Sequence, residues 1–131
     1  MAFDMNQWGI SGNLTRDCEE RMLNDGTSII NFSVAVNDRK KNRDTGEWED
    51  DPNYFDCVFF AKTEKQRNLY VHSLLKGTRV VVSGKGKWRS WESKDGQRRS
   101  KVELNANLVE IVKPPKGATP AAPADDADIP F

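Results

Sequence analysis

The chain has 131 residues, of which 37% are hydrophobic and 31% charged, and its formal net charge at pH 7 is zero. This length suits one domain with a modest core, and the composition excludes collagen-like and wholly disordered chains. No window approaches the roughly 18 apolar residues of a membrane-spanning helix, no signal peptide is evident, and two isolated cysteines suit a reducing compartment, so we expect a cytoplasmic protein with no membrane partner.

The charge is unevenly distributed along the chain. Residues 1–61 carry 6 basic and 12 acidic side chains, residues 62–116 carry 14 and 5, and residues 117–131 carry 0 and 3. A basic segment favours polyanions and an acidic segment favours cations. The middle of the chain is therefore predicted to bind a polyanion, and its end a cationic partner.

The first half of the chain predicts three strands. Residues 10–14, ISGNL, form a short expected strand in which Gly12 marks a bend or a close backbone approach. A turn sequence at 24–28 introduces a second strand, whose apolar face consists of Ile30, Phe32, Val34 and Val36. The aromatic stretch 54–61 predicts a third strand.

A charged segment, residues 37–54, separates the second and third strands. It contains the turn signal Thr45-Gly46 and has Pro52 near its end, so it predicts a long, exposed hairpin loop. Trp48 within it either stacks on bases or remains mobile.

The second half of the chain changes from strand to helix and back. Thr63 followed by Gln66 forms a capping box, and Gly77 is expected as the C-cap of a helix of about three turns. Two long strands follow at 78–91 and 98–112, joined by a hairpin turn at Asp95-Gly96.

This order of elements is that of an all-β, five-stranded OB-fold barrel, in which one helix lies between strands three and four. From Lys113 onward proline and alanine dominate, which favours a disordered tail. We therefore expect an OB-fold domain over residues 1–112. A Pro/Ala-rich linker is expected over 113–124, and an acidic partner-docking tip over 125–131.

No catalytic site, metal site or cofactor is expected. The one histidine, His72, falls in the predicted helix without a nucleophile motif, and GKGKW at 84–88 lacks the helix that follows a phosphate-binding loop. The acidic residues lack the spacing of a calcium loop. Cys57 is expected to be a buried small hydrophobe, whereas Cys18 is uninformative.

The hairpin at 85–101 is the most distinctive feature of the folded part. It combines Trp88 and Trp91 with seven basic residues and two acidic ones, the basic set being Lys85, Lys87, Arg89, Lys94, Arg98, Arg99 and Lys101. A single-stranded nucleic acid needs cations along its backbone and flat side chains on which unpaired bases stack. Positions 88 and 91 point to opposite faces of a regular strand, so Trp91, which shares its face with Lys87 and Arg89, is the better platform. Trp88 is a second platform, a core residue or an interface residue.

Strand 54–61 offers further platforms for bases. Its aromatic residues are divided between two faces, and a small core needs only one of them. One face holds Phe55, Cys57 and Phe59, and the other holds Tyr54, Val58 and Phe60. We expect Phe60 to act as a platform beside Lys62 as a phosphate ligand.

Taken in this order, the segments resemble the bacterial single-stranded DNA-binding protein family. The resemblance is carried by GNL (12–14), NFSVAVND (31–38), DTGE (44–47), YFDCVFFAK (54–62), LLKGTRVVVSGK (74–85), Trp91 with DGQRR (95–99), and DDADIPF (125–131). It implies an OB-fold, no catalysis, no cofactor and a homo-oligomer, most often a tetramer. We expect the contact between copies at the first strand, residues 6–14.

The resemblance also implies which residues contact single-stranded DNA. Tyr54, Phe60 and Trp91 match stacking positions. The cations implied near the phosphate path are Lys62, Lys85, Lys87, Arg89, Arg98 and Arg99. Where the family often has another aromatic residue, this chain has a charged residue at about Lys40.

The tip DDADIPF places apolar residues after acidic ones. Such a segment suits a small apolar pocket rimmed by Arg and Lys on another protein. Its candidate partner-binding residues are Asp125, Asp126, Asp128, Ile129, Pro130 and Phe131. Similar tips in the family dock onto replication, recombination and repair proteins, which implies a nucleoid-associated protein.

Three other functions stay open on the residues alone. An RNA-binding OB-fold module would use the same platforms. An interaction adaptor would use the barrel only to display the tail. An oligosaccharide-binding OB domain is the third, although it has no evident use for the acidic tip.

Overall fold

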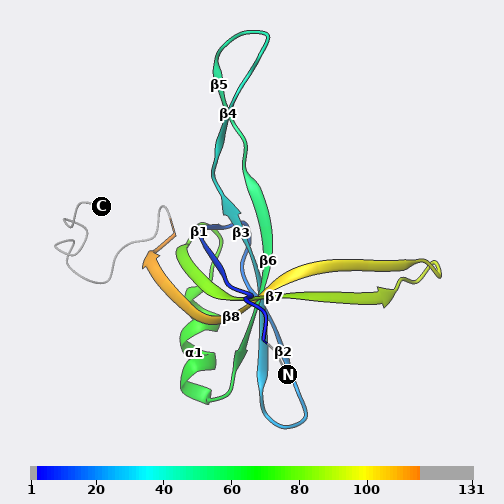
Figure 1. Cartoon of the computed structure of the whole chain (residues 1–131). Helices are drawn as coiled ribbons and strands as arrows, with labels where there is room; N and C mark the ends of the chain where they lie inside the picture. The colour runs from blue at the N-terminus through cyan, green and yellow to red at the C-terminus, as the bar shows by residue number, and fades with distance from the viewer. Residues whose placement is uncertain (1–2, 116–131) are drawn as a thin grey trace, which may run out of the picture.

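The computed structural model of the chain describes residues 3–115. Within them it contains eight strands and one helix, labelled in Figure 1. In chain order these are β1 (Trp8–Leu14), β2 (Glu19–Met22), β3 (Ser28–Val36), β4 (Arg39–Lys41), β5 (Trp48–Asp50), β6 (Asn53–Ala61), α1 (Glu64–Ser73), β7 (Arg79–Glu92) and β8 (Arg98–Lys113). The predicted tip and most of the predicted linker lie outside the described residues.

Five of the strands close into a barrel. The main sheet runs in the order β1-β7-β8-β6-β3-β2, and β1 also pairs with β3, so that β1, β7, β8, β6 and β3 form a ring. The pairing of β6 with β8 is parallel, and the other pairings in the ring are antiparallel. With α1 between β6 and β7, the structure confirms the predicted all-β OB-fold.

The inner face of the ring forms the hydrophobic core. Ile30, Phe32 and Val34 of β3 are almost fully buried, as the alternation of the sequence predicted, and Val80 and Val82 of β7 are buried opposite them. Each fully buried side chain of this size stabilises the fold by about 1.5–3 kcal/mol. Residues that alternate with them, such as Asn31 and Val81, are more exposed and face away from this core.

Cys57 belongs to this core, as its place on the third predicted strand suggested. It is 1% exposed, and burial, with a smaller effect of the Asp56 carboxylate, raises the pKa of its thiol to about 12. A thiol with so high a pKa stays protonated at neutral pH. Cys57 is therefore a small hydrophobe rather than a nucleophile.

The ring closes between β1 and β3 at a glycine. A Cβ atom on Gly12 would lie 2.1 Å from the backbone oxygen of Ala35 and 2.9 Å from the Cγ1 atom of Val34. The predicted close approach at Gly12 is confirmed. Any larger residue there would push β1 away from β3.

The helix α1 begins where the sequence predicts and ends earlier. Thr63 is the N-cap, and its hydroxyl oxygen accepts a hydrogen bond from the amide of Gln66. The predicted C-cap was wrong: Leu74, not Gly77, ends the helix, because its amide bonds to Tyr70 and its side chain is drawn into the core. Gly77 instead adopts a φ of 90° in the turn before β7. α1 is too short and too polar to cross a membrane, and it is the only helix of the described part of the chain.

Two pairings differ from the sequence-based expectation. β2 was not predicted; it pairs with β3 across the expected turn at Gly26 and adds a strand outside the ring. Residues 37–54, expected as a loop, contain a two-stranded ribbon of β4 and β5 around the predicted turn at Gly46. These short strands are exposed throughout and consist of charged residues and Trp48, so they lack the apolar alternation that signals a strand. Figure 1 shows this ribbon and the β7–β8 hairpin extending away from the barrel.

The closure at Gly12 predicts a large effect of one added methyl group. Gly12→Ala should lower the free energy of unfolding by about 1–3 kcal/mol or more, because overpacking against backbone atoms is costly. Gly9→Ala, on the same strand, is the matched control, since nothing lies within 4 Å of a Cβ at that position. Urea unfolding measures both variants, and equal midpoints would contradict the close contact.

Candidate nucleic-acid interface

One continuous surface is formed by the outward-facing residues of four neighbouring strands. The strand register places Asn31 of β3 beside Val58 of β6, Val58 beside Asn105 of β8, and Asn105 beside Lys85 of β7. Residues two apart on a strand share a face. We call this surface the outer sheet face, and its residues are Ile29, Asn31, Tyr54, Asp56, Val58, Phe60, Lys85, Lys87, Arg89, Trp91, Arg99, Lys101, Glu103 and Asn105.

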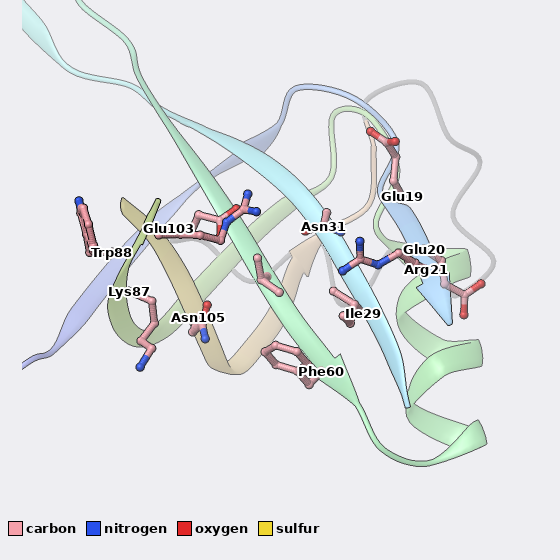
Figure 2. Close-up of a pocket in the computed structure, with 12 residues that line it drawn as sticks. Glu19, Glu20, Arg21, Ile29, Asn31, Phe60, Lys87, Trp88, Glu103 and Asn105 are labelled. Carbon is pink, nitrogen blue, oxygen red and sulfur yellow. The ribbon is translucent and has the colours of Figure 1, made fainter. Parts of the chain in front are cut away.

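A groove of about 510 Å³ lies on the outer sheet face. Its apolar part is provided by Ile29, Val58 and Phe60, and its polar part includes Asn31 and Asn105. Figure 2 shows side chains of β3, β6, β7 and β8 along it. Its charged lining is mixed, with Arg21, Lys87 and Arg89 beside Glu19, Glu20 and Glu103. The apolar side chains and the cations suit a base with its attached phosphate.

Phe60 and Tyr54 stand at two ends of the β6 part of the outer sheet face. Phe60 is 39% exposed and Tyr54 is 67% exposed, whereas Phe59 between them is buried in the core. The alternation predicted for this strand is therefore confirmed. At about 3.3 Å per residue, six positions along a strand separate the two rings by about 20 Å.

The β7–β8 hairpin divides its residues between two faces. Trp91 pairs with Arg99 across the hairpin, and it alternates with Lys87 and Arg89 on the outer sheet face. The sequence-based expectation that these three residues share a face is borne out. The Cζ atom of Arg89 lies 5.0 Å from the centre of the Trp91 ring, which is a cation–π contact.

The opposite face of the hairpin holds Trp88 and Arg98. Trp88 pairs with Val102, Arg98 pairs with Glu92, and Trp88 is 68% exposed. Trp88 borders the groove, but in Figure 2 its ring points away from Lys87. The two tryptophans thus face opposite sides, and Arg98 is separated from Arg99 in the same way.

The remaining predicted cations are exposed. Lys85 and Lys87 lie on the outer sheet face, and Lys87 borders the groove. Lys62 is exposed immediately after β6, two residues beyond Phe60. The structure therefore brings Phe60, Trp91, Lys85, Lys87 and Arg89 onto one surface, as a polymer-binding site requires.

Two acidic residues lie among these cations, and sequence reasoning missed both. Lys101 Nζ lies 3.2 Å from Asp56 Oδ2 and 3.2 Å from Glu103 Oε2, and Arg89 Nε lies 3.1 Å from Glu103 Oε1. Asp56 also accepts a hydrogen bond of 2.6 Å from the Ser33 hydroxyl. That hydrogen bond, followed by the effect of Lys101, holds the pKa of Asp56 below its usual value. We call these five residues the outer-face network.

The groove residues Asn31, Asn105 and Ile29 were also missed as site residues. The sequence did carry a signal that the two asparagines face outward. Asn31 lies opposite the apolar face of its strand, and Asn105 alternates with the buried Leu104. What the sequence lacked was the register that sets β3, β6 and β8 side by side.

Other singled-out residues lie elsewhere. Trp8 is half-buried on β1, with its ring 6.1 Å from that of Phe55 and in an edge arrangement, so it packs rather than stacks on a ligand. Trp48 is exposed on the β4–β5 ribbon opposite Lys41, and His72 is exposed on α1. Within residues 3–115 no three His, Cys, Asp or Glu side chains are grouped to hold a metal ion.

A closed five-stranded barrel with one helix between β6 and β7 defines this chain as an OB-fold module, a class whose sheet face and loops bind oligonucleotides or oligosaccharides. The sequence places it further: the chain belongs to the Single-strand binding protein family, whose model matches residues 5–112. The match begins before β1 and ends one residue before the end of β8, so it includes all the other strands and the helix.

Curated relatives agree with this family. A single-stranded DNA-binding protein of Borreliella burgdorferi is 45% identical over 102 residues, which cover 77% of this chain and 65% of the relative. A protein of the same description from Treponema pallidum is 36% identical over 125 residues, which cover 95% of this chain and 66% of the relative. The chain thus spans somewhat less than two thirds of the length of either relative.

The fold is also that of a solved structure described as a Plasmodium falciparum SSB complex with ssDNA. The TM-score is 0.71 at 23% identity, over 86% of this chain and 97% of the other. At this identity the likeness establishes the barrel fold.

Proposed function

We propose that this chain binds single-stranded DNA without sequence preference and protects exposed strands during replication, recombination and repair, without catalysis. The observation that carries the proposal is the outer sheet face, on which the aromatic rings of Phe60 and Trp91 lie together with Lys85 and Lys87, and which holds a groove lined in part by Phe60 and Lys87. The relatives described as single-stranded DNA-binding proteins support the choice of polymer.

The physical basis is stacking assisted by charge. Each base that stacks on an aromatic ring contributes about 1–3 kcal/mol, and every base has a face that can stack. Phosphate contacts with Lys85 and Lys87 add attraction that weakens as salt is raised. Platforms that accept any base, together with a backbone that is the same for all sequences, give binding without sequence preference.

Fluorescence titration with oligo-dT tests the proposal on a matched pair of variants. Wild-type tryptophan emission should be quenched on binding and recover when salt is added. Trp91→Ala should weaken binding about 5-fold to 150-fold, the equivalent of one lost stacked base at about 1–3 kcal/mol. Trp88→Ala should have a smaller effect, because Trp88 lies on the opposite face of the same hairpin.

The same experiment tests which nucleic acid the protein prefers. Matched RNA and double-stranded DNA should compete poorly with oligo-dT. Equal competition by RNA would indicate an RNA-binding module, and an unquenched wild-type protein would remove the proposal altogether. A protein whose cellular function survives the double change Phe60→Ala with Trp91→Ala would be an adaptor instead.

We infer that the protein forms a homo-oligomer, with a tetramer as the form most consistent with its family. In support, β1 pairs with β7 along most of its length but with β3 only at Asn13 and Leu14, which leaves one edge of residues 8–12 unpaired within the described chain. A second copy can extend the sheet at such an edge. Exposed apolar residues on neighbouring strands, Val81 and Leu108, offer a further contact surface.

Light scattering of the free protein measures the number of chains in the oligomer. A tetramer has four times the 14.9 kDa of one chain, and a species of a single chain at micromolar concentration would contradict the inference.

The segment from residue 113 onward is the proposed site for partner proteins. We infer that residues 113–124 act as a linker and residues 125–131 as a docking tip for replication, recombination and repair proteins with a basic, apolar pocket. The alignment with the Treponema pallidum relative covers 95% of this chain, so it extends beyond the barrel into this segment. Such a role suits a cytoplasmic protein associated with the nucleoid.

Deleting residues 125–131 should abolish capture of partner proteins and tighten DNA binding at low salt, because the acidic tip competes with DNA for the basic surface. A charge-preserving control, Phe131→Ala, should reduce partner capture while DNA affinity stays near that of the wild type. Unchanged DNA affinity after the deletion would remove the competition, and unchanged partner capture would remove the docking role.

A further inference from the structure

The outer-face network gives two of the cations on the DNA surface a role other than phosphate binding. The inference rests on the proposed function. We propose that Glu103 is a positioning residue: it holds Arg89 over Trp91 and keeps Arg89 and Lys101 from serving as phosphate ligands.

The position of Glu103 makes its pairing hard to break. The residue is only 8% exposed, and both of its carboxylate oxygens are used, one by Arg89 and the other by Lys101. A buried carboxylate that loses its cations is strongly destabilising, because neither water nor another charge replaces them. A phosphate that drew Arg89 away would therefore have to compensate for that loss.

Asp56 is the second carboxylate of the network, and it pairs with Lys101. Asp56 accepts hydrogen bonds from Ser33 and Lys101, so Lys101 lies between two anions on adjacent strands β6 and β8. The four ionised side chains have no net charge together. In electrostatic terms the network adds nothing to the attraction between the protein and a polyanion.

The network acts instead on the stacking platform. Arg89 is fixed on one side by Glu103, and its guanidinium lies over Trp91 at 5.0 Å from the ring centre. A ring that is held before DNA arrives loses less side-chain entropy on binding than a free one. Glu103 thus contributes to binding through Trp91, by way of Arg89.

Lysines outside the network are left to bind phosphates. Lys85 is exposed, pairs with Asn105 rather than with an acid, and forms no ion pair among the described residues. It is therefore the matched comparison for Arg89 on the same strand and the same face.

The test is the salt dependence of oligo-dT binding for the wild type, Arg89→Gln and Lys85→Gln. For single strands the slope of log K against log salt changes by about 0.7 for each phosphate contact. Lys85→Gln should make the slope shallower by about that amount. Arg89→Gln should leave the slope unchanged and weaken binding by the same factor at every salt concentration, because it disturbs Trp91 and not a phosphate contact. A shallower slope for Arg89→Gln would overturn the proposal.

Glu103→Gln tests the network from its other side. Removing this charge frees Arg89 and Lys101 for phosphates, so the slope should become steeper by about 0.7 to 1.4. Binding at high salt, where stacking dominates, should become weaker. Glu92→Gln removes the same charge from the opposite face of the hairpin and should change neither quantity.

The possible outcomes distinguish a failure of the proposed role of the network from a failure of the proposed function. Absence of wild-type binding would overturn both. Normal wild-type binding with a slope for Glu103→Gln equal to that of the wild type would overturn the network alone, as would undiminished binding of that variant at high salt. Thermal unfolding of each variant identifies a loss of fold, and Arg89→Gln, an exposed position, decides the question if Glu103→Gln is unfolded.

Discussion

The structure depends on the closure of the barrel between β1 and β3. β1 joins β7 on one side and reaches β3 at its end, where Gly12 allows the two backbones to come together. Closure gives every ring strand an inner and an outer face, because side chains alternate along a strand. The inner residues pack into the core, and the outer residues of four strands become one surface. The outer sheet face is in this sense a consequence of the same pairing that stabilises the fold.

The register of the strands decides which chemistry is combined on that surface. Asn31, Val58 and Asn105 come from three strands far apart in sequence, and pairing sets them side by side at the groove. A slip of one residue in any pairing would exchange the two faces. The core therefore fixes the site: Phe59 and Cys57 pack into the core cluster, so Phe60 and Val58 lie on the outer sheet face, where both line the groove.

Some of the charged side chains on the outer sheet face are paired with one another. The hairpin is rich in lysine and arginine, yet Asp56 and Glu103 pair with Lys101 and Arg89. Affinity for a polyanion depends on cations without such partners, and stacking depends on rings held in place. Phosphate binding and base stacking are thus carried by different side chains on the same surface. A protein with no net charge can in this way offer both cations for phosphates and rigid platforms for bases.

The sequence by itself determined the order of the five ring strands and the helix, the two faces of these strands, and the placement of Trp91 on the same face as Lys87 and Arg89. Local signals were enough for these: the cap at Thr63, the turn at Asp95-Gly96, and the alternation that separates Trp91 from Trp88. It failed at β2 and the β4–β5 ribbon, whose charged strands give no apolar period, and at the end of α1, where burial of Leu74 outweighs the glycine signal. Only the tertiary structure decided that Glu103 and Asp56 lie among the cations. The contact between Asp56 and Lys101 joins residues separated by more than forty positions, and pairing across such distances depends on the closed sheet rather than on any local pattern.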